Sequence, residues 1–172
     1  MIKEGIVPVG KATRNAIEKN HIETVRTIVE NGGNGNLAVY TALSEGHTKI
    51  VKDLFGLQDK LQTSGQSLAI EIKTDYKLSR NRTPLLIAVE ENNLEAMEYL
   101  LERKANIDHE DVDGQTALVY AARQSNAKMV ELLLSRGAAA KKGLALEWIK
   151  ESKELSEKEK KDLINKLTTE TF

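Results

Sequence analysis

Two stretches in the middle of the chain share one pattern of apolar and polar positions. In each stretch the apolar side chains fall three or four residues apart in two successive runs, which predicts a pair of amphipathic helices joined by a short polar turn. The second stretch repeats the first at a constant offset of 33 residues, which is typical of stacked supersecondary units. The matching positions are Thr83 and Thr116, Leu85 and Leu118, Ala88 and Ala121, Leu100 and Leu133, and Ala105 and Ala138.

Several residues in these stretches resemble the ankyrin repeat family. The order Thr83-Pro84-Leu85 matches the Thr-Pro-Leu start of the first helix in that family. A threonine hydroxyl can cap the first amides of a helix, and proline suits its first position. Asn81 and Gly114 fall where the hairpin turn of the family needs positive φ, and Gly137 falls where the second helix stops.

The resemblance implies an all-α fold, an α-solenoid in which about four helix pairs stack with short β-hairpin loops and a C-terminal helical cap. We therefore expect one ankyrin repeat domain over residues 1–172. Its approximate repeats are 8–33, 34–78, 79–110 and 111–140, and the cap is 141–172. The leucines at positions 100, 101, 133 and 134 are expected to be buried between neighbouring repeats, and no strand is expected within 117–134.

The first two repeats are spaced more closely than the others. An offset of 26 residues superposes Ala16 on Ala42, and the Asn20-His21 step on Gly46-His47. The shortening is expected in the glycine-rich segment Asn31–Asn36, which predicts a tight turn.

An insertion of 13 residues, within 56–80, separates the second and third repeats. Leu57 and Leu61 continue the apolar spacing of the preceding helix. Residues 68, 70 and 72 are large and apolar and alternate with Ala69, Glu71 and Lys73, which favours a short strand or an extended arm. The arm can project and offer Tyr76 to a partner, or it can fold back over the second helix.

After residue 140 the period is lost. The stretch Gly143–Lys150 predicts a short helix with Leu144 and Trp148 on one face. Ser156 and Glu159 have the spacing of a capping box and predict the start of a last helix, with an apolar stripe at Leu163, Ile164 and Leu167.

Composition narrows the function classes. The net charge of −1 gives no field that attracts nucleic acid or an anionic membrane, and the absence of cysteine excludes disulfides and thiolate sites. The longest apolar run, Ala117–Ala122, is too short to span a bilayer, and the N-terminal residues lack the apolar core of a secretory signal. We expect a cytoplasmic protein.

Candidate catalytic and metal sites are weak. Asp111, Asp113 and Gly114 fit three positions of a calcium loop, but His109 and Tyr120 stand where two of its carboxylates belong. His47 has no partner at helical spacing, and the adjacent Glu90 and Glu91 diverge around a helix. We expect no enzyme activity, no cofactor and no metal.

A protein-binding surface remains. The resemblance implies that hairpin tips and the exposed face of each first helix line a concave groove that binds partners. Among these positions Arg80, Arg82 and Arg123 are the strongest candidates, since arginine is enriched in interface hot spots. The full set is Glu18, Lys19, Ser44, Glu45, Tyr76, Ser79, Arg80, Arg82, Glu90, Glu91, Val112, Asp113, Gln115, Arg123 and Gln124.

The function expected from the resemblance is a non-catalytic interaction module, such as an adaptor, that binds another protein and is monomeric when unbound. The mixed charge of the groove argues against nucleic acid, and no membrane partner is expected. The alternatives are an effector of an intracellular bacterium acting on a host protein in the host cytosol, an enzyme with a site in the 56–80 insert, and a purely structural role through self-assembly.

Overall fold

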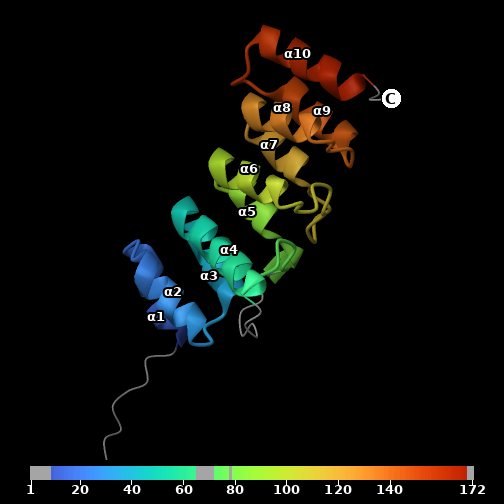
Figure 1. Cartoon of the computed structure of the whole chain (residues 1–172). Coiled ribbons are helices and arrows are strands. Elements are labelled where there is room, and N and C mark those ends of the chain that lie inside the picture. Colours follow the sequence, from blue (N-terminus) through green and yellow to red (C-terminus); the bar gives the residue numbers. More distant parts are fainter. Residues whose placement is uncertain (1–8, 65–71, 78, 170–172) are drawn as a thin grey trace, which may run out of the picture. The chain divides into compact units, whose positions relative to one another are not determined.

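The computed structural model describes residues 9–64, 72–77 and 79–169, and these residues contain ten α-helices and no strand (Figure 1). The all-α fold is therefore confirmed. None of the helices in this part of the chain combines the length and the apolar character needed to cross a bilayer. The helices are α1 (Val9–Glu18), α2 (Ile22–Glu30), α3 (Gly35–Ser44), α4 (Thr48–Thr63), α5 (Pro84–Glu90), α6 (Leu94–Glu102), α7 (Ala117–Arg123), α8 (Ala127–Ser135), α9 (Lys142–Glu151) and α10 (Glu157–Thr168).

The chain forms two compact units, Met1–Tyr76 and Lys77–Phe172. In the first unit α1 pairs with α2 and α3 pairs with α4, while α1 packs on α3 and α2 packs on α4. Ile17, Leu43 and Phe55 are among its fully buried side chains. Each pair therefore supplies one layer, and the core lies between the layers.

The turn inside each helix pair is built in the same way in both units. A residue with positive φ ends the first helix, and the next residue is the N-cap of the second helix. In the second unit the N-caps are asparagines, and the side chains of Asn93 and Asn126 accept hydrogen bonds from the amides of Ala96 and Met129. The residues with positive φ are Asn20, Gly46, Asn92 and Ser125.

The glycine-rich turn between α2 and α3 is shorter than expected. Helix α3 begins at Gly35, so the last two residues of the predicted Asn31–Asn36 turn belong to the helix. Asn34 caps it, because its Oδ1 accepts a hydrogen bond from Leu37 N–H at 3.0 Å. A Cβ at position 33 would lie 2.7 Å from Ile28 O, so the close approach of the chain there requires Gly33.

The insertion begins as a longer helix and ends against the first unit. As expected, α4 continues through Leu57 and Leu61, and its last residue is Thr63. Ile72 is buried, and its N–H donates to Gln58 Oε1 at 2.7 Å, while Lys73 N–H donates to Asn36 Oδ1 at 2.8 Å. The end of the insertion therefore folds back onto α3 and α4. The predicted strand lies mostly outside the described residues.

In the second unit the predicted helix starts are confirmed. Thr83 and Thr116 cap α5 and α7, and their hydroxyls accept hydrogen bonds from the amides three residues later at 3.4 Å. The turn residues Asn81, Gly114 and Gly137 all have positive φ. The 33-residue repeat thus produces two nearly identical helix pairs, α5–α6 and α7–α8.

The core of these pairs corrects one expectation. Leu100 and Leu133 are fully buried, but Leu101 and Leu134 are only half-buried. Successive residues on an α-helix point about 100° apart, so a short two-layered helix buries only one of two adjacent leucines completely.

Helices α9 and α10 follow the second pair and pack against α7 and α8, respectively. The capping box of α10 is confirmed, with Ser156 N–H donating to Glu159 Oε2 at 2.8 Å. The inward face of α9 is one position later than predicted: Ala145 and Ile149 are buried, whereas Trp148 is 39% exposed. The sequence alone could not show which side of this short helix faces α7.

Candidate protein-binding surface

Two neighbouring turns of the second unit are joined by one backbone hydrogen bond and two from side chains to backbone. Arg80 O accepts from Val112 N–H at 3.1 Å, and Glu110 O accepts from Asn81 Nδ2 at 2.8 Å. The ring of His109 donates through Nε2 to Asn81 O at 2.8 Å. An ion pair between Arg80 and Asp113 adds a side-chain link. The turns 79–82 and 108–115 therefore lie side by side as one structure.

The second of these turns is also fixed to the segment before α9. Asp108 Oδ1 accepts from the N–H groups of Ala139 at 2.9 Å and Ala140 at 3.0 Å. Lys141 Nζ lies 3.1 Å from Glu110 Oε2. Three successive turns of the second unit are thus connected in a row.

Asp111 organises the middle turn from inside. Its Oδ1 accepts hydrogen bonds from Asp113 N–H and Gln115 N–H, both at 2.9 Å. Its Oδ2 accepts from Tyr120 Oη–H at 2.7 Å. Asp111 and Tyr120 are both buried, so this carboxylate ties the turn to the first turn of α7 away from water.

The pKa values of this pair follow from these contacts. Burial alone would raise the pKa of Asp111, but the hydrogen bonds from Gln115, Tyr120 and Asp113, together with nearby Arg80, hold it below its ordinary value. For Tyr120, burial and the hydrogen bond to the Asp111 carboxylate raise the pKa to about 12. The pair is therefore a carboxylate and a neutral phenol at neutral pH.

This raised pKa predicts alkaline destabilisation. An unfolded chain releases the tyrosine proton near pH ~10, whereas folded Tyr120 keeps it to about 12. The folded state thus binds more protons in this window, so the stabilisation is complete below pH ~10 and is lost as the pH rises towards 12. The loss should be on the order of 2 kcal/mol. Urea denaturation of wild type and Tyr120→Phe at both limits checks it, because the variant should lack this component; an equal fall in both proteins would contradict it.

The predicted binding residues of the second unit differ in exposure. Arg80, with 58% of its side chain exposed, stands beside Asp113 at the tips of the turns, and Val112 is 61% exposed. The exposed members of the set are Ser79, Arg80, Glu91, Val112, Asp113 and Arg123, and the half-buried members are Arg82, Glu90, Gln115 and Gln124.

Three of these residues hold one another in place. Arg82 Nη1 lies 2.5 Å from Glu90 Oε2, and the Arg82 side chain is only 19% exposed. Gln124 Nε2 donates to Glu90 O at 2.8 Å, which links α7 to α5. In contrast, the exposed Arg123 guanidinium lies 4.8 Å from the centre of the Tyr120 ring. Arg123 is therefore exposed above a buried aromatic ring, whereas Arg82 is half-buried and paired with Glu90.

The remaining predicted residues belong to the first unit. Glu18, Lys19 and Glu45 are exposed, whereas Ser44 and Tyr76 are half-buried. The structure thus brings the second-unit residues together within one unit and places these five in the other.

The residues considered for a calcium loop are occupied within the turn. Asp111 accepts hydrogen bonds from backbone and phenol groups, and Asp113 pairs with Arg80. Across residues 9–64, 72–77 and 79–169, no three His, Cys, Asp or Glu side chains are grouped in a way that could hold a metal ion.

Sequence reasoning missed the roles of His109, Asp111 and Tyr120. One signal was present: Tyr120 occupies the repeat position of Ile87, which is a buried aliphatic residue. A phenol at a core position of the repeat requires a buried acceptor. The Asp-Val-Asp-Gly turn nearby offered one.

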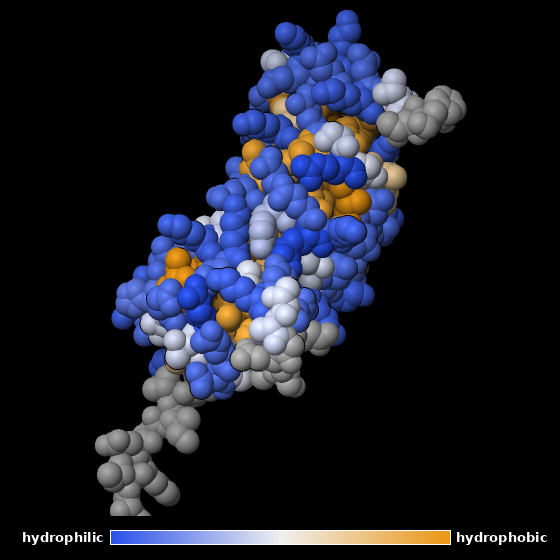
Figure 2. Space-filling view, in the orientation of Figure 1, coloured by the Kyte–Doolittle hydropathy of each residue, from blue (hydrophilic) through white to orange (hydrophobic). Residues whose placement is uncertain are grey.

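The second unit also exposes apolar surface. Figure 2 shows an apolar area over the α7–α9 part of the second unit, bordered by hydrophilic side chains. Val112 and Trp148 are the large hydrophobic residues exposed in the described part of the chain. Exposed apolar surface with a polar border is typical of interaction sites.

Comparison with known proteins identifies the repeat. Residues 62–143 match a family model described as ankyrin repeats in three copies. The chain is 29% identical to leucine-rich repeat serine/threonine-protein kinase 1 of Caenorhabditis elegans over 119 residues, which are 62% of this chain and 5% of that protein. It is 31% identical to potassium channel AKT2/3 of Arabidopsis thaliana, over 61% of this chain and 11% of that protein.

A third relative carries the repeat in its name. The chain is 30% identical to human ankyrin repeat and SOCS box protein 11 over 60% of its own length and 28% of that protein. The chain thus spans only a small part of the length of each of these relatives. The three relatives are named as a protein kinase, a potassium channel and a SOCS box protein, so they differ in kind from one another.

Proposed function

The chain belongs to the ankyrin repeat family, and we propose that it is a non-catalytic adaptor module that binds a partner protein through the row of turns in its second unit. Ankyrin repeats are generally protein–protein interaction modules. The proposed contact surface consists of the turns 79–82 and 108–115 together with the exposed end of α7.

The observation that carries this proposal is the hydrogen bonding of the turns to one another. The contacts Arg80 O to Val112 N and Asn81 Nδ2 to Glu110 O fix the turns before any partner arrives. A surface that is already ordered loses little conformational entropy on binding, so more of the contact energy appears as affinity.

The chemistry of the surface favours a protein partner. Val112 offers an apolar tip, and Arg123 offers a planar cation stacked on Tyr120. Around them the charges alternate in sign, with Arg80 beside Asp113 and Lys141 beside Glu110. A phosphate backbone would be repelled by the carboxylates, whereas a folded protein can match both signs.

A charge reversal at Arg123 tests the proposal. A partner is captured from an extract of the source cells, purified, and titrated against the full chain. Arg123→Glu should weaken its binding by about tenfold or more, because an exposed arginine held over an aromatic ring is a typical hot-spot residue when it lies in an interface. Lys128→Glu introduces the same charge change on the exposed side of α8 and should alter the affinity by less than about twofold.

Both variants must be shown to fold as the wild type does. Arg123 is exposed and forms no ion pair with any other residue of the described part of the chain, so thermal unfolding of Arg123→Glu should stay close to wild type. If both variants bind as wild type does, or if Lys128→Glu is the one that loses binding, the row of turns is not the contact surface.

A further inference from the structure

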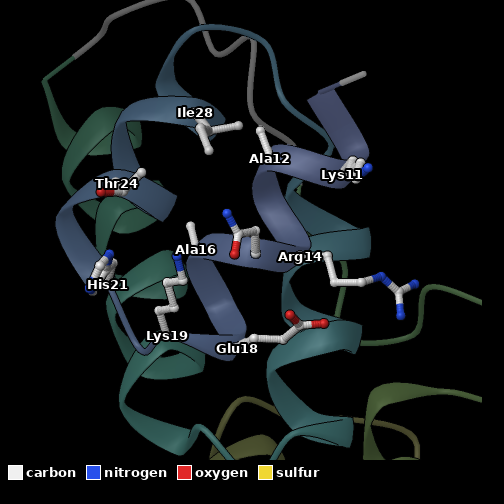
Figure 3. A pocket seen from close by; sticks show the side chains of 10 residues that line it. Lys11, Ala12, Arg14, Ala16, Glu18, Lys19, His21, Thr24 and Ile28 are labelled. Atoms are coloured by element: carbon white, nitrogen blue, oxygen red, sulfur yellow. The ribbon is translucent and has the colours of Figure 1, made fainter. Parts of the chain in front are cut away.

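A hollow of about 720 Å³ lies on the first helix pair and is lined from both α1 and α2. Figure 3 shows Ala12, Ala16 and Ile28 around its middle, with Thr24 beside them on α2. On each helix two of these residues stand four positions apart, so they form a shallow floor along the pair.

The same positions are completely covered in the next helix pair. The offset of 26 residues that aligns the two pairs places Ala12, Ala16, Thr24 and Ile28 on Ala38, Ala42, Ile50 and Leu54. All four residues of the second pair are at most 1% exposed. Helix packing thus buries this face completely in the second pair. In the first pair Ala16 is also buried, but Ala12 and Ile28 are half-buried and Thr24 is exposed among the described residues.

The border of the hollow is mainly cationic. Lys11, Arg14 and Lys19 line it together with a single carboxylate, Glu18. In Figure 3, Lys11 and Arg14 extend on the α1 side, and Lys19 lies towards the end of that helix. A ligand that covers the floor therefore gains from negative charge at its flanks.

The charges also disfavour a second copy of the chain docked by its C-terminal helices. A hollow on α9 and α10 is itself lined by Lys150, Lys160 and Lys161, and Glu157 is the one acidic residue among its lining residues. Two cationic borders repel each other, so the charges favour an acidic partner over end-to-end stacking of two copies of this chain.

We propose that the open face of α1 and α2 docks an amphipathic helix of another protein that carries acidic residues beside its apolar stripe. The apolar stripe lies on Ala12, Ala16 and Ile28, where small side chains permit a close approach of the helix backbone. The acidic residues face Lys11, Arg14 and Lys19. This surface belongs to the first unit and is separate from the turns proposed above, so either binding site can exist without the other.

Three synthetic peptides test the proposal with the full chain. They share one apolar helical stripe and differ only in flanking residues, which are glutamate, glutamine or lysine. Titration followed by amide and methyl NMR shifts should give the affinity order glutamate, glutamine, lysine, with the largest shifts at Ala12, Ala16 and Ile28. The glutamate peptide should bind about tenfold more weakly to Lys11→Glu/Lys19→Glu, because two attractions become repulsions.

A matched variant separates local from general charge effects. Lys49→Glu/Lys60→Glu makes the same charge change at exposed positions of α4 in the same unit, and it should keep the affinity within about twofold. An equal loss in both variants, no binding of the glutamate peptide, or shifts centred elsewhere would overturn the proposal. The proposal would also be overturned if deletion of residues 1–8, without any peptide, produced the same NMR shifts at Ala12, Ala16 and Ile28. Residues 1–8 would then be the occupant of the hollow.

Discussion

Leu133→Ala should lower the free energy of unfolding by about 2–5 kcal/mol, since the side chain is completely buried and its removal leaves a cavity. Leu133 lies in α8, which packs on α7 and α10. Because a repeat contacts only its neighbours, the loss should first loosen α7 to α10, while the first unit keeps its protection. Urea denaturation gives the size of the effect, and hydrogen exchange gives its place.

The adjacent leucine is the matched control. Leu134 has the same side chain on the same helix but is only half-buried. Leu134→Ala should therefore cost about 1 kcal/mol, as a partial loss of buried area. An equal cost for the two variants, or an unchanged midpoint for Leu133→Ala, would show that the burial assigned to α8 is wrong.

Asp111→Ala should cost about 2–4 kcal/mol, because it removes three hydrogen bonds to a charged acceptor and leaves the buried Tyr120 hydroxyl without its partner. The turn 108–115 should also become mobile, which is visible as faster amide exchange at Asp113 and Gln115. The control is Asp113→Ala, which removes an exposed carboxylate of the same turn and should cost at most about 1 kcal/mol.

A double-mutant cycle isolates the contact between Asp111 and Tyr120. Tyr120→Phe removes the hydroxyl that loses its acceptor, so Asp111→Ala should cost less in that background. The difference should be on the order of 1–2 kcal/mol. Additive costs would mean that the 2.7 Å contact between Asp111 Oδ2 and Tyr120 Oη contributes nothing to stability.

The features that the sequence predicted are local ones. Thr83 and Pro84 start a helix through groups within one turn of each other, and Asn81 and Gly114 adopt positive φ for reasons contained in single residues. The capping box at Ser156 is equally local. Such features repeat with the sequence, so the 33-residue period was sufficient to predict the helix pairs of the second unit.

The features that the sequence did not predict depend on contacts between segments. The inward face of α9 is fixed by its packing on α7, which turned Ala145 inward and left Trp148 exposed. The return of the insertion depends on Gln58 and Asn36, which accept hydrogen bonds from Ile72 and Lys73. No short-range pattern encodes either choice, and the same holds for the division into two compact units.

The proposed surface has a corresponding mixture of predicted and unpredicted parts. Family positions indicated Arg80, Val112 and Arg123, all of which are exposed in the second unit. They could not show that Arg82 is held by Glu90, because the two residues are eight positions apart and meet only when α5 has formed. The exposed fraction of each side chain thus distinguishes candidate contact residues, such as Arg123, from a residue such as Arg82 that holds the structure in place.

The most direct measurement of the central claim is site-specific cross-linking at Val112. A photo-reactive side chain replaces Val112, whose exposed position is at the tip of the turn, or Glu98, which is exposed on α6. In an extract of the source cells, position 112 should give one dominant protein adduct that Arg123→Glu abolishes, and position 98 should give none. Equal adducts from both positions, or none from position 112, would contradict binding through the row of turns.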